Sequence, residues 1–108
     1  MARIDLPMYR WFISRQGVRI VTNTYSGSLG TLPDKGCLST QTFNYRVYVD
    51  ISSGEESRFR LIAESCIIQP WSLGGEKTDF ERAEFESSEK GVGEASKWLV
   101  LTAAKYGF

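Results

Sequence analysis

Histidine is absent from this chain of 108 residues, and only two cysteines are present. Without an imidazole, the chain cannot by itself build a Ser-His or Cys-His nucleophile or a histidine-ligated metal centre. Cys37 and Cys66 are too few for a four-thiolate zinc site and too far apart for a CxxC redox motif. We therefore expect no catalytic residue, no metal and no cofactor. The two thiols are expected to be reduced, with a single disulfide as the alternative.

Long hydrophobic runs are also missing from the sequence. No apolar stretch approaches the roughly 20 residues of a membrane span. Asp5 and Pro7 interrupt the segment in which a secretory signal would need continuous apolar residues. We predict a cytoplasmic protein that does not enter a membrane.

Neither sign of charge is in excess, because 13 Lys and Arg residues face 13 Asp and Glu residues. This balance argues against a protein dedicated to binding polyanions. The two parts of the chain differ, however: residues 1–60 hold eight bases and five acids, and residues 61–108 hold five bases and eight acids. We expect a molecule with two surfaces of different charge, which favours a protein partner.

No internal repeat or linker divides the chain, so residues 1–108 are predicted to form one domain. The apolar pattern is strand-like from Met8 to about Ile68 and helical from about Gly93. We predict an α+β fold in which an antiparallel, meander-like sheet of about five strands has one C-terminal helix packed across one face.

The clearest strand is predicted over residues 43–51, where the odd positions are all apolar and the even positions are mostly polar. A second strand is expected from Arg58, with a bulge or a stretch buried on both faces near residues 66–68. Odd positions must pair with odd ones, because a one-residue slip would move every side chain to the other face. A three-residue loop at 53–55 then predicts the pairs Val49 with Phe59, Val47 with Leu61, Asp50 with Arg58 and Tyr48 with Arg60.

The remaining elements have less regular patterns. Segments 8–14 and 18–25 are expected to form a hairpin in which Gly17 takes a positive φ. Residues 26–42 are expected to form a long flap-like loop, and residues 79–86 favour a strand over a short helix. A helix is predicted over residues 94–105, with N-cap oxygens from the serines at 87 and 88 and a stop at Gly107. The stripe expected to pack on the sheet is Ala95, Trp98, Leu99, Thr102 and Tyr106.

Arginines beside an aromatic residue mark the first candidate site. In the predicted register, the exposed face of one hairpin carries Arg46, Tyr48, Arg58 and Arg60. Such planar donors suit phosphates, stacked bases or carboxylates. Acids on the same face partly neutralise it, so a charge-mixed solvent face is the alternative.

A second candidate site is acidic. Residues 76–94 contain seven carboxylates and three bases, and Glu84 and Glu86 are expected at solvated positions of the last strand. Solvated carboxylates do not suit a paired-acid mechanism, which needs one desolvated group. The segment is either a solvated acidic face or a docking surface for a basic partner.

The C-terminal helix has more apolar residues than one core-facing stripe needs. Leu101 and Phe108 lie off the stripe, together with Val100 and Ala104. Either this second side is covered by the 26–42 loop or by Trp71 and Leu73, or it contacts a subunit or partner.

These features predict a small non-enzymatic protein that binds another protein, as an inhibitor, immunity factor or adaptor would, with a homodimer as a further expectation. The alternative is a nucleic-acid-binding domain that uses the Arg- and Tyr-rich sheet face. A third hypothesis is a small-ligand pocket beneath the 26–42 flap. The candidate binding residues are Arg46, Tyr48, Arg58, Arg60, Leu101, Phe108, Glu84 and Glu86.

Overall fold

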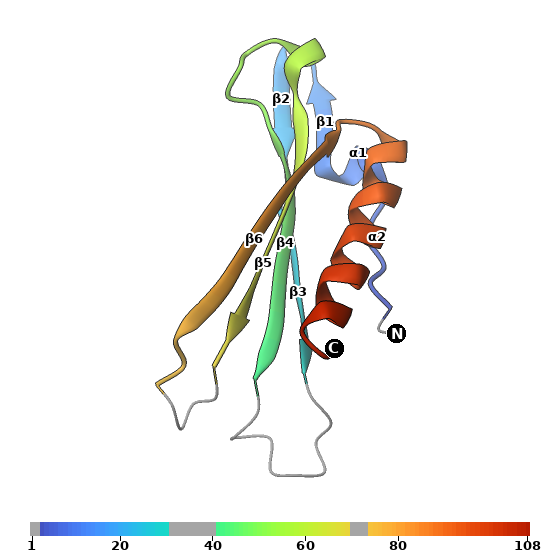
Figure 1. Ribbon diagram of the computed structural model, residues 1–108. Coiled ribbons are helices and arrows are strands. Elements are labelled where there is room, and N and C mark those ends of the chain that lie inside the picture. The colour runs from blue at the N-terminus through green and yellow to red at the C-terminus, as the bar shows by residue number, and fades with distance from the viewer. Residues whose placement is uncertain (1–2, 31–40, 70–73) are drawn as a thin grey trace.

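The computed structural model describes residues 3–30, 41–69 and 74–108. Within them, six strands form one two-stranded and one four-stranded antiparallel sheet, and a long C-terminal helix packs against the larger sheet (Figure 1). The predicted α+β class is confirmed, and the larger sheet is a meander in the order β3-β4-β5-β6. The elements are α1 (Tyr9–Phe12), β1 (Ile13–Gln16), β2 (Arg19–Thr22), β3 (Tyr25–Gly30), β4 (Thr42–Asp50), η3 (Glu56–Arg58), β5 (Arg60–Ile68), β6 (Lys77–Glu86) and α2 (Glu89–Lys105).

The hairpin of β4 and β5 has the predicted facing but a different register. The short 3-10 helix η3 removes residues 56–58 from β5 and lengthens the connection, so the expected three-residue loop is wrong. The register moves by two positions, and odd residues of β4 still pair with odd residues of β5. The observed pairs are Val49 with Leu61, Val47 with Ala63, Asp50 with Arg60 and Tyr48 with Ile62.

A bulge interrupts the pairing of β5 with β6, near the position predicted from the sequence. Ser65 pairs with Glu81 but Ile67 pairs with Thr78, so β6 has one more residue in this interval than β5. Asp79 lies in this interval with φ 54°, in the left-handed region that bulges commonly use. The predicted strand at 79–86 is confirmed as part of β6.

The N-terminal hairpin is present but shorter than predicted. Gly17 turns the chain with φ 65°, and β1 and β2 pair on either side of it. Residues 9–12 form the helical turn α1 instead of a strand. This turn lets Phe12 and Ile13 both pack on the core, whereas neighbouring residues of a strand would point to opposite faces.

β3 occupies part of the segment that the sequence predicts as a loop. It pairs with β4 from Tyr25 opposite Val47 to Gly30 opposite Thr42. Gly27 suits this position, because a Cβ atom would lie 2.4 Å from the hydroxyl oxygen of Tyr45 across the ladder and would push that side chain aside. Cross-strand packing thus outweighs the low strand propensity of glycine. Residues 31–40 of the predicted flap, which include Cys37, lie outside the described residues, as do Trp71 and Leu73.

α2 begins at Glu89, earlier than the predicted residue 94. The hydroxyl oxygen of Ser88 accepts a hydrogen bond from the backbone N–H of Gly91 at 3.2 Å, so Ser88 is the N-cap. At the other end, Gly107 has φ 88°, and the N–H of Phe108 donates to the carbonyl of Ala103 at 2.9 Å. This Schellman-type ending confirms the predicted stop.

The core lies between α2 and one face of the larger sheet. The predicted helix stripe is confirmed, because Ala95, Leu99 and Thr102 are buried and Trp98 and Tyr106 pack partly against the core. None of the helices in the described parts of the chain combines the length and hydrophobicity needed to cross a bilayer. The main buried apolar residues on this side are Ile4, Phe12, Phe43, Val47, Leu61, Ile67, Ala95 and Leu99.

Candidate functional site

The sheet face opposite α2 has no helix over it in the described residues, and we call it the open face (Figure 1). Even-numbered positions supply its side chains, as the alternation along a strand requires. Its polar and apolar members are Ser26, Ser28, Asn44, Arg46, Tyr48, Asp50, Arg60, Ile62, Glu64, Cys66, Ile68, Phe80, Arg82, Glu84 and Glu86, with Lys77 joining them beyond the bulge.

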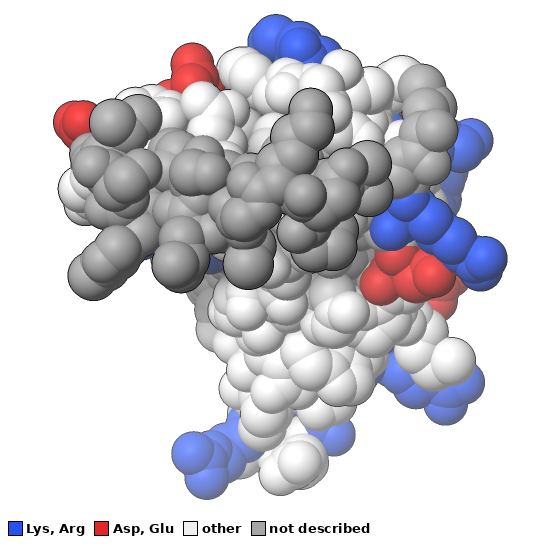
Figure 2. Space-filling model, turned by 90° about the horizontal axis from the view of Figure 1, so that it is seen from below, with Lys and Arg blue, Asp and Glu red and all other residues white. Residues whose placement is uncertain are grey.

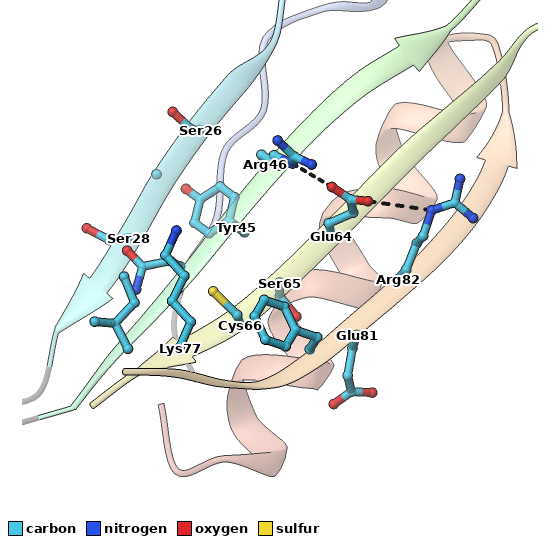
Figure 3. Close-up of a pocket in the computed structure, with 14 residues that line it drawn as sticks. Ser26, Ser28, Tyr45, Arg46, Glu64, Ser65, Cys66, Lys77, Glu81 and Arg82 are labelled. Carbon is cyan, nitrogen blue, oxygen red and sulfur yellow. Dashed lines mark hydrogen bonds and ion pairs between the residues drawn. The ribbon is translucent and has the colours of Figure 1, made fainter. Parts of the chain in front are cut away.

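A row of alternating charge crosses the centre of the open face. The strand register places Arg46, Glu64 and Arg82 side by side on β4, β5 and β6. Arg46 donates from Nε to Glu64, and Nε of Arg82 lies 3.5 Å from the other carboxylate oxygen (Figure 3). The hydrogen bond to Glu64 raises the pKa of Arg46 above its ordinary value. Glu64, with a side chain only 24% exposed, therefore contacts two arginines whose side chains are 60% and 49% exposed.

Tyr48 and Ile62 give the open face a small apolar centre. The hydroxyl of Tyr48 donates to Glu64 at 3.4 Å, and the guanidinium of Arg46 lies 5.5 Å from the centre of its ring. Ile62, paired with Tyr48, is fully buried although it is not part of the helix-side core. These contacts hold the aromatic ring in place beside the charged row.

A groove of about 770 Å³ lies on the half of the open face nearest the bulge. Cys66 and Ile68 lie within it, and Figure 3 shows Ser26 and Ser28 on the β3 side. Phe80, on the β6 side, is 70% exposed. Phe80 faces the groove because it belongs to the same even-numbered set of β6 as Arg82, Glu84 and Glu86.

The two ends of the open face carry opposite charge. At the groove, Arg46, Arg82 and Lys77 accompany Glu64. At the other end, Arg60 lies opposite Asp50 on β4 and Glu86 on β6, and Glu84 lies next to them. Ser52 donates a hydrogen bond to Asp50, which holds the pKa of that carboxyl below its usual range. Viewed from the end of the sheet, basic and acidic side chains form small separate groups, with no continuous area of one sign (Figure 2).

Five of the six candidate residues from the predicted strands are brought together on this face, and one is not. Arg46, Tyr48, Arg60, Glu84 and Glu86 share the open face. Arg58 does not, because it belongs to η3 and forms an ion pair with Glu55 at 3.2 Å. The expectation of separate Arg-rich and Glu-rich surfaces is therefore wrong: the register places both signs on one face, with most bases toward the groove and most acids toward the other end.

The helix candidates are separated by the structure. Leu101 is 60% exposed, as expected for a surface position. Phe108 is turned back by the helix ending, and its ring centre lies 6.1 Å from that of Phe43. Phe108 and Val100 pack partly against the core, so of the two helix candidates only Leu101 is largely exposed, and the second contact surface stays a prediction.

Several groove residues were not singled out by the sequence analysis. Lys77, Phe80 and Arg82 line the groove from β6. The alternation along the predicted strand could have identified Arg82, because Arg82 belongs to the same even-numbered set as Glu84 and Glu86. The bulge hides this signal for Lys77, because it reverses the facing of the residues that precede it.

The site offers recognition groups. In the described parts of the chain, no three potential ligands from histidine, cysteine, aspartate or glutamate gather as a metal site would require. Arginine forks, hydroxyls and an exposed aromatic ring suit binding of carboxylates and extended backbone. Comparisons of the chain with protein-family models, with curated proteins and with solved structures find no match.

Proposed function

We propose that this protein is a small non-enzymatic module that binds another protein through the open face of its four-stranded sheet. The observation that carries the proposal is the charge reversal along this face, from the cationic groove at Arg46 and Arg82 to the acidic end at Glu84 and Glu86. A protein surface can complement both signs at once, and such complementarity gives specificity. The exposed ring of Phe80 would supply the apolar contact that protein interfaces concentrate near their centre.

A nucleic acid fits this face less well. A polyanion gains affinity from cations that follow its backbone. Here Glu64 neutralises part of the central row, and three acids surround Arg60. An inhibitor, immunity or adaptor role, a cytoplasmic setting and self-association remain predictions within the same proposal.

Site-specific photocrosslinking tests the proposal. A photoreactive phenylalanine analogue at position 80 samples the open face, and the same analogue at position 18 is the matched control, because Val18 is 99% exposed in the turn of the β1–β2 hairpin. In cells of the source organism, we expect a discrete protein adduct from position 80 and none from position 18. The adduct is identified by mass spectrometry, and the purified partner should bind the Phe80→Ala variant at least tenfold more weakly than wild type.

Other outcomes are equally informative. If the same proteins crosslinked to position 80 and to position 18, the open face would not be the interface. Adducts at position 80 that nuclease removes would favour the nucleic-acid alternative.

A further inference from the structure

We infer that the groove on the open face binds an extended acidic segment of the partner protein, with an apolar side chain next to the acids. The inference rests on the proposed function and names the chemistry of the partner. The groove, at about 770 Å³, falls within the roughly 300–1,000 Å³ of typical ligand sites, and strands β3 to β6 all contribute to its lining.

The two arginines of the central row hold donors that the protein leaves unused. Among the described residues, Arg46 contacts Glu64 through Nε alone, so both terminal nitrogens of its guanidinium remain for a ligand. Arg82 makes only long contacts, at 3.5 Å to Glu64 and 3.5 Å to Glu84. A guanidinium fork binds a carboxylate through two parallel hydrogen bonds. Glu64 thus orients both arginines without occupying their outer donors.

The groove keeps an excess of positive charge. Lys77 is the third cation, and its ammonium forms no ion pair within the described residues. Glu81 also borders the groove, but its carboxylate is engaged on the helix side by Lys105 at 3.0 Å and by the hydroxyl of Tyr106 at 2.6 Å. Arg46, Arg82 and Lys77 therefore face a single acid in the groove, Glu64, because Lys105 already neutralises Glu81. This balance favours an acidic ligand.

The neutral groups of the groove match a peptide backbone. Ser26 and Ser28 place exposed hydroxyls along β3. The amide nitrogen of Asn44 donates to Thr42, which leaves the side-chain carbonyl oxygen of Asn44 available to a backbone N–H. Phe80 offers an exposed aromatic surface for an apolar side chain.

The spacing of Arg46 and Arg82 fits a partner peptide that has acidic residues at positions i and i+2. Arg46 and Arg82 lie on strands separated by β5, so their Cα atoms are about 10 Å apart, and the Nε atom of each arginine faces Glu64 (Figure 3). In an extended peptide, side chains at i and i+2 lie on one side, about 7 Å apart.

Selection from a displayed library of random eight-residue peptides against the full chain tests the inference. We expect enriched peptides to contain two Asp or Glu residues spaced by one position, next to an aromatic or aliphatic residue. In fluorescence anisotropy, such a peptide should bind at least fivefold more weakly to the Arg82→Gln and Lys77→Gln variants. The Lys97→Gln variant, at an exposed position of α2 away from the open face, is the matched control and should change binding less than twofold.

The Lys77→Gln variant separates a loss of peptide binding from a loss of folding, because Lys77 makes no ion pair or hydrogen bond with Glu64. Cys66 reports the location, since bound peptide should slow alkylation of this groove thiol in a Cys37→Ser background. Enrichment of basic or uncharged peptides, no enrichment at all, or equal losses in the Lys77 and Lys97 variants would overturn the inference. Tighter binding of a ten-residue oligothymidine than of any acidic peptide would also overturn it, in favour of a nucleic acid.

The two proposals fail in different ways. If position 80 still crosslinks to an identified protein while acidic peptides are not selected, the partner binds the open face by other chemistry. If the crosslinking fails as well, the open face is not the binding surface.

Discussion

Arg60 and Leu61 are neighbours on β5 but lie in different environments. Leu61 is fully buried on the helix side of the sheet, whereas Arg60 is exposed on the open face between an acid on β4 and an acid on β6. The same strand therefore contributes to the core through one residue and to a charged surface through the next. The difference indicates that stability comes mainly from the helix side and that the open face is available for recognition.

Ile62 is an exception to this division between a buried helix side and an exposed open face. It lies on the open face and is nevertheless fully buried beneath its neighbours, so the open face also has an ordered centre. The binding residues around it are thus held by packing as well as by ion pairs. Such support keeps recognition groups in position before a partner arrives.

The largest expected effect separates the two faces at adjacent positions. Leu61→Ala should lower the free energy of unfolding by about 2–5 kcal/mol, because it removes a fully buried side chain and leaves a cavity. Arg60→Ala should change it by about 0.5 kcal/mol or less. Urea denaturation followed by circular dichroism measures both. Similar losses for the two variants would contradict the assignment of stability to the helix side.

A glycine pair in α2 gives the next largest effect. A Cβ atom at Gly91 would lie 1.7 Å from the carbonyl oxygen of Glu86, so Gly91→Ala must move the end of β6 away from the helix. We expect a loss of about 1–3 kcal/mol. Gly93 has no atom within 4 Å of such a Cβ and is exposed, so Gly93→Ala should stabilise the protein by up to about 1 kcal/mol. Thermal unfolding of the two variants should therefore shift in opposite directions.

The smallest effect concerns a carboxylate on each face. Hydrogen bonds from Tyr106 and Lys105 hold the pKa of Glu81 below its usual value of 4.5. Ionised Glu81 therefore stabilises the fold above about pH 4.5, and this contribution is lost as the pH falls through the lowered pKa. Glu81→Gln should lower the free energy of unfolding at neutral pH by about 1 kcal/mol or less, because the group is near the surface.

The pH dependence and a matched variant check this interpretation. The difference between wild type and Glu81→Gln should disappear in acid, as measured by urea denaturation at several pH values. Glu84→Gln, on the open face, removes only a contact of 3.5 Å to Arg82 and should have a smaller effect at neutral pH. Equal effects of the two substitutions would show that the faces do not differ in this respect.

Much of the fold was predictable because local patterns carried it. Alternation along residues 43–51 correctly assigned which side chains of β4 face the core. Ser88 and Gly107 marked the two ends of α2, although the predicted start at residue 94 was late. The helix began earlier because close packing against the end of β6 makes glycine necessary at Gly91, overriding its poor helix propensity.

The candidate site was less predictable because it depends on register. Parity gave the correct face for Arg46, Tyr48 and Arg60, but η3 removed Arg58 from the sheet. Which charges lie side by side depends on how β5 and β6 align, and that alignment includes a bulge at Asp79. The sequence could not show that Arg82 would lie next to Glu64.

The sequence by itself determined the periodicities, the helix stripe, the tight turn at Gly17 and the lack of any imidazole. These properties follow from local stereochemistry and composition. The tertiary structure alone decided that Ser26 to Gly30 would be a strand and that Phe108 would pack on Phe43. It also placed acids and arginines in rows on one face, because pairing between strands depends on contacts distant in sequence that no local pattern specifies.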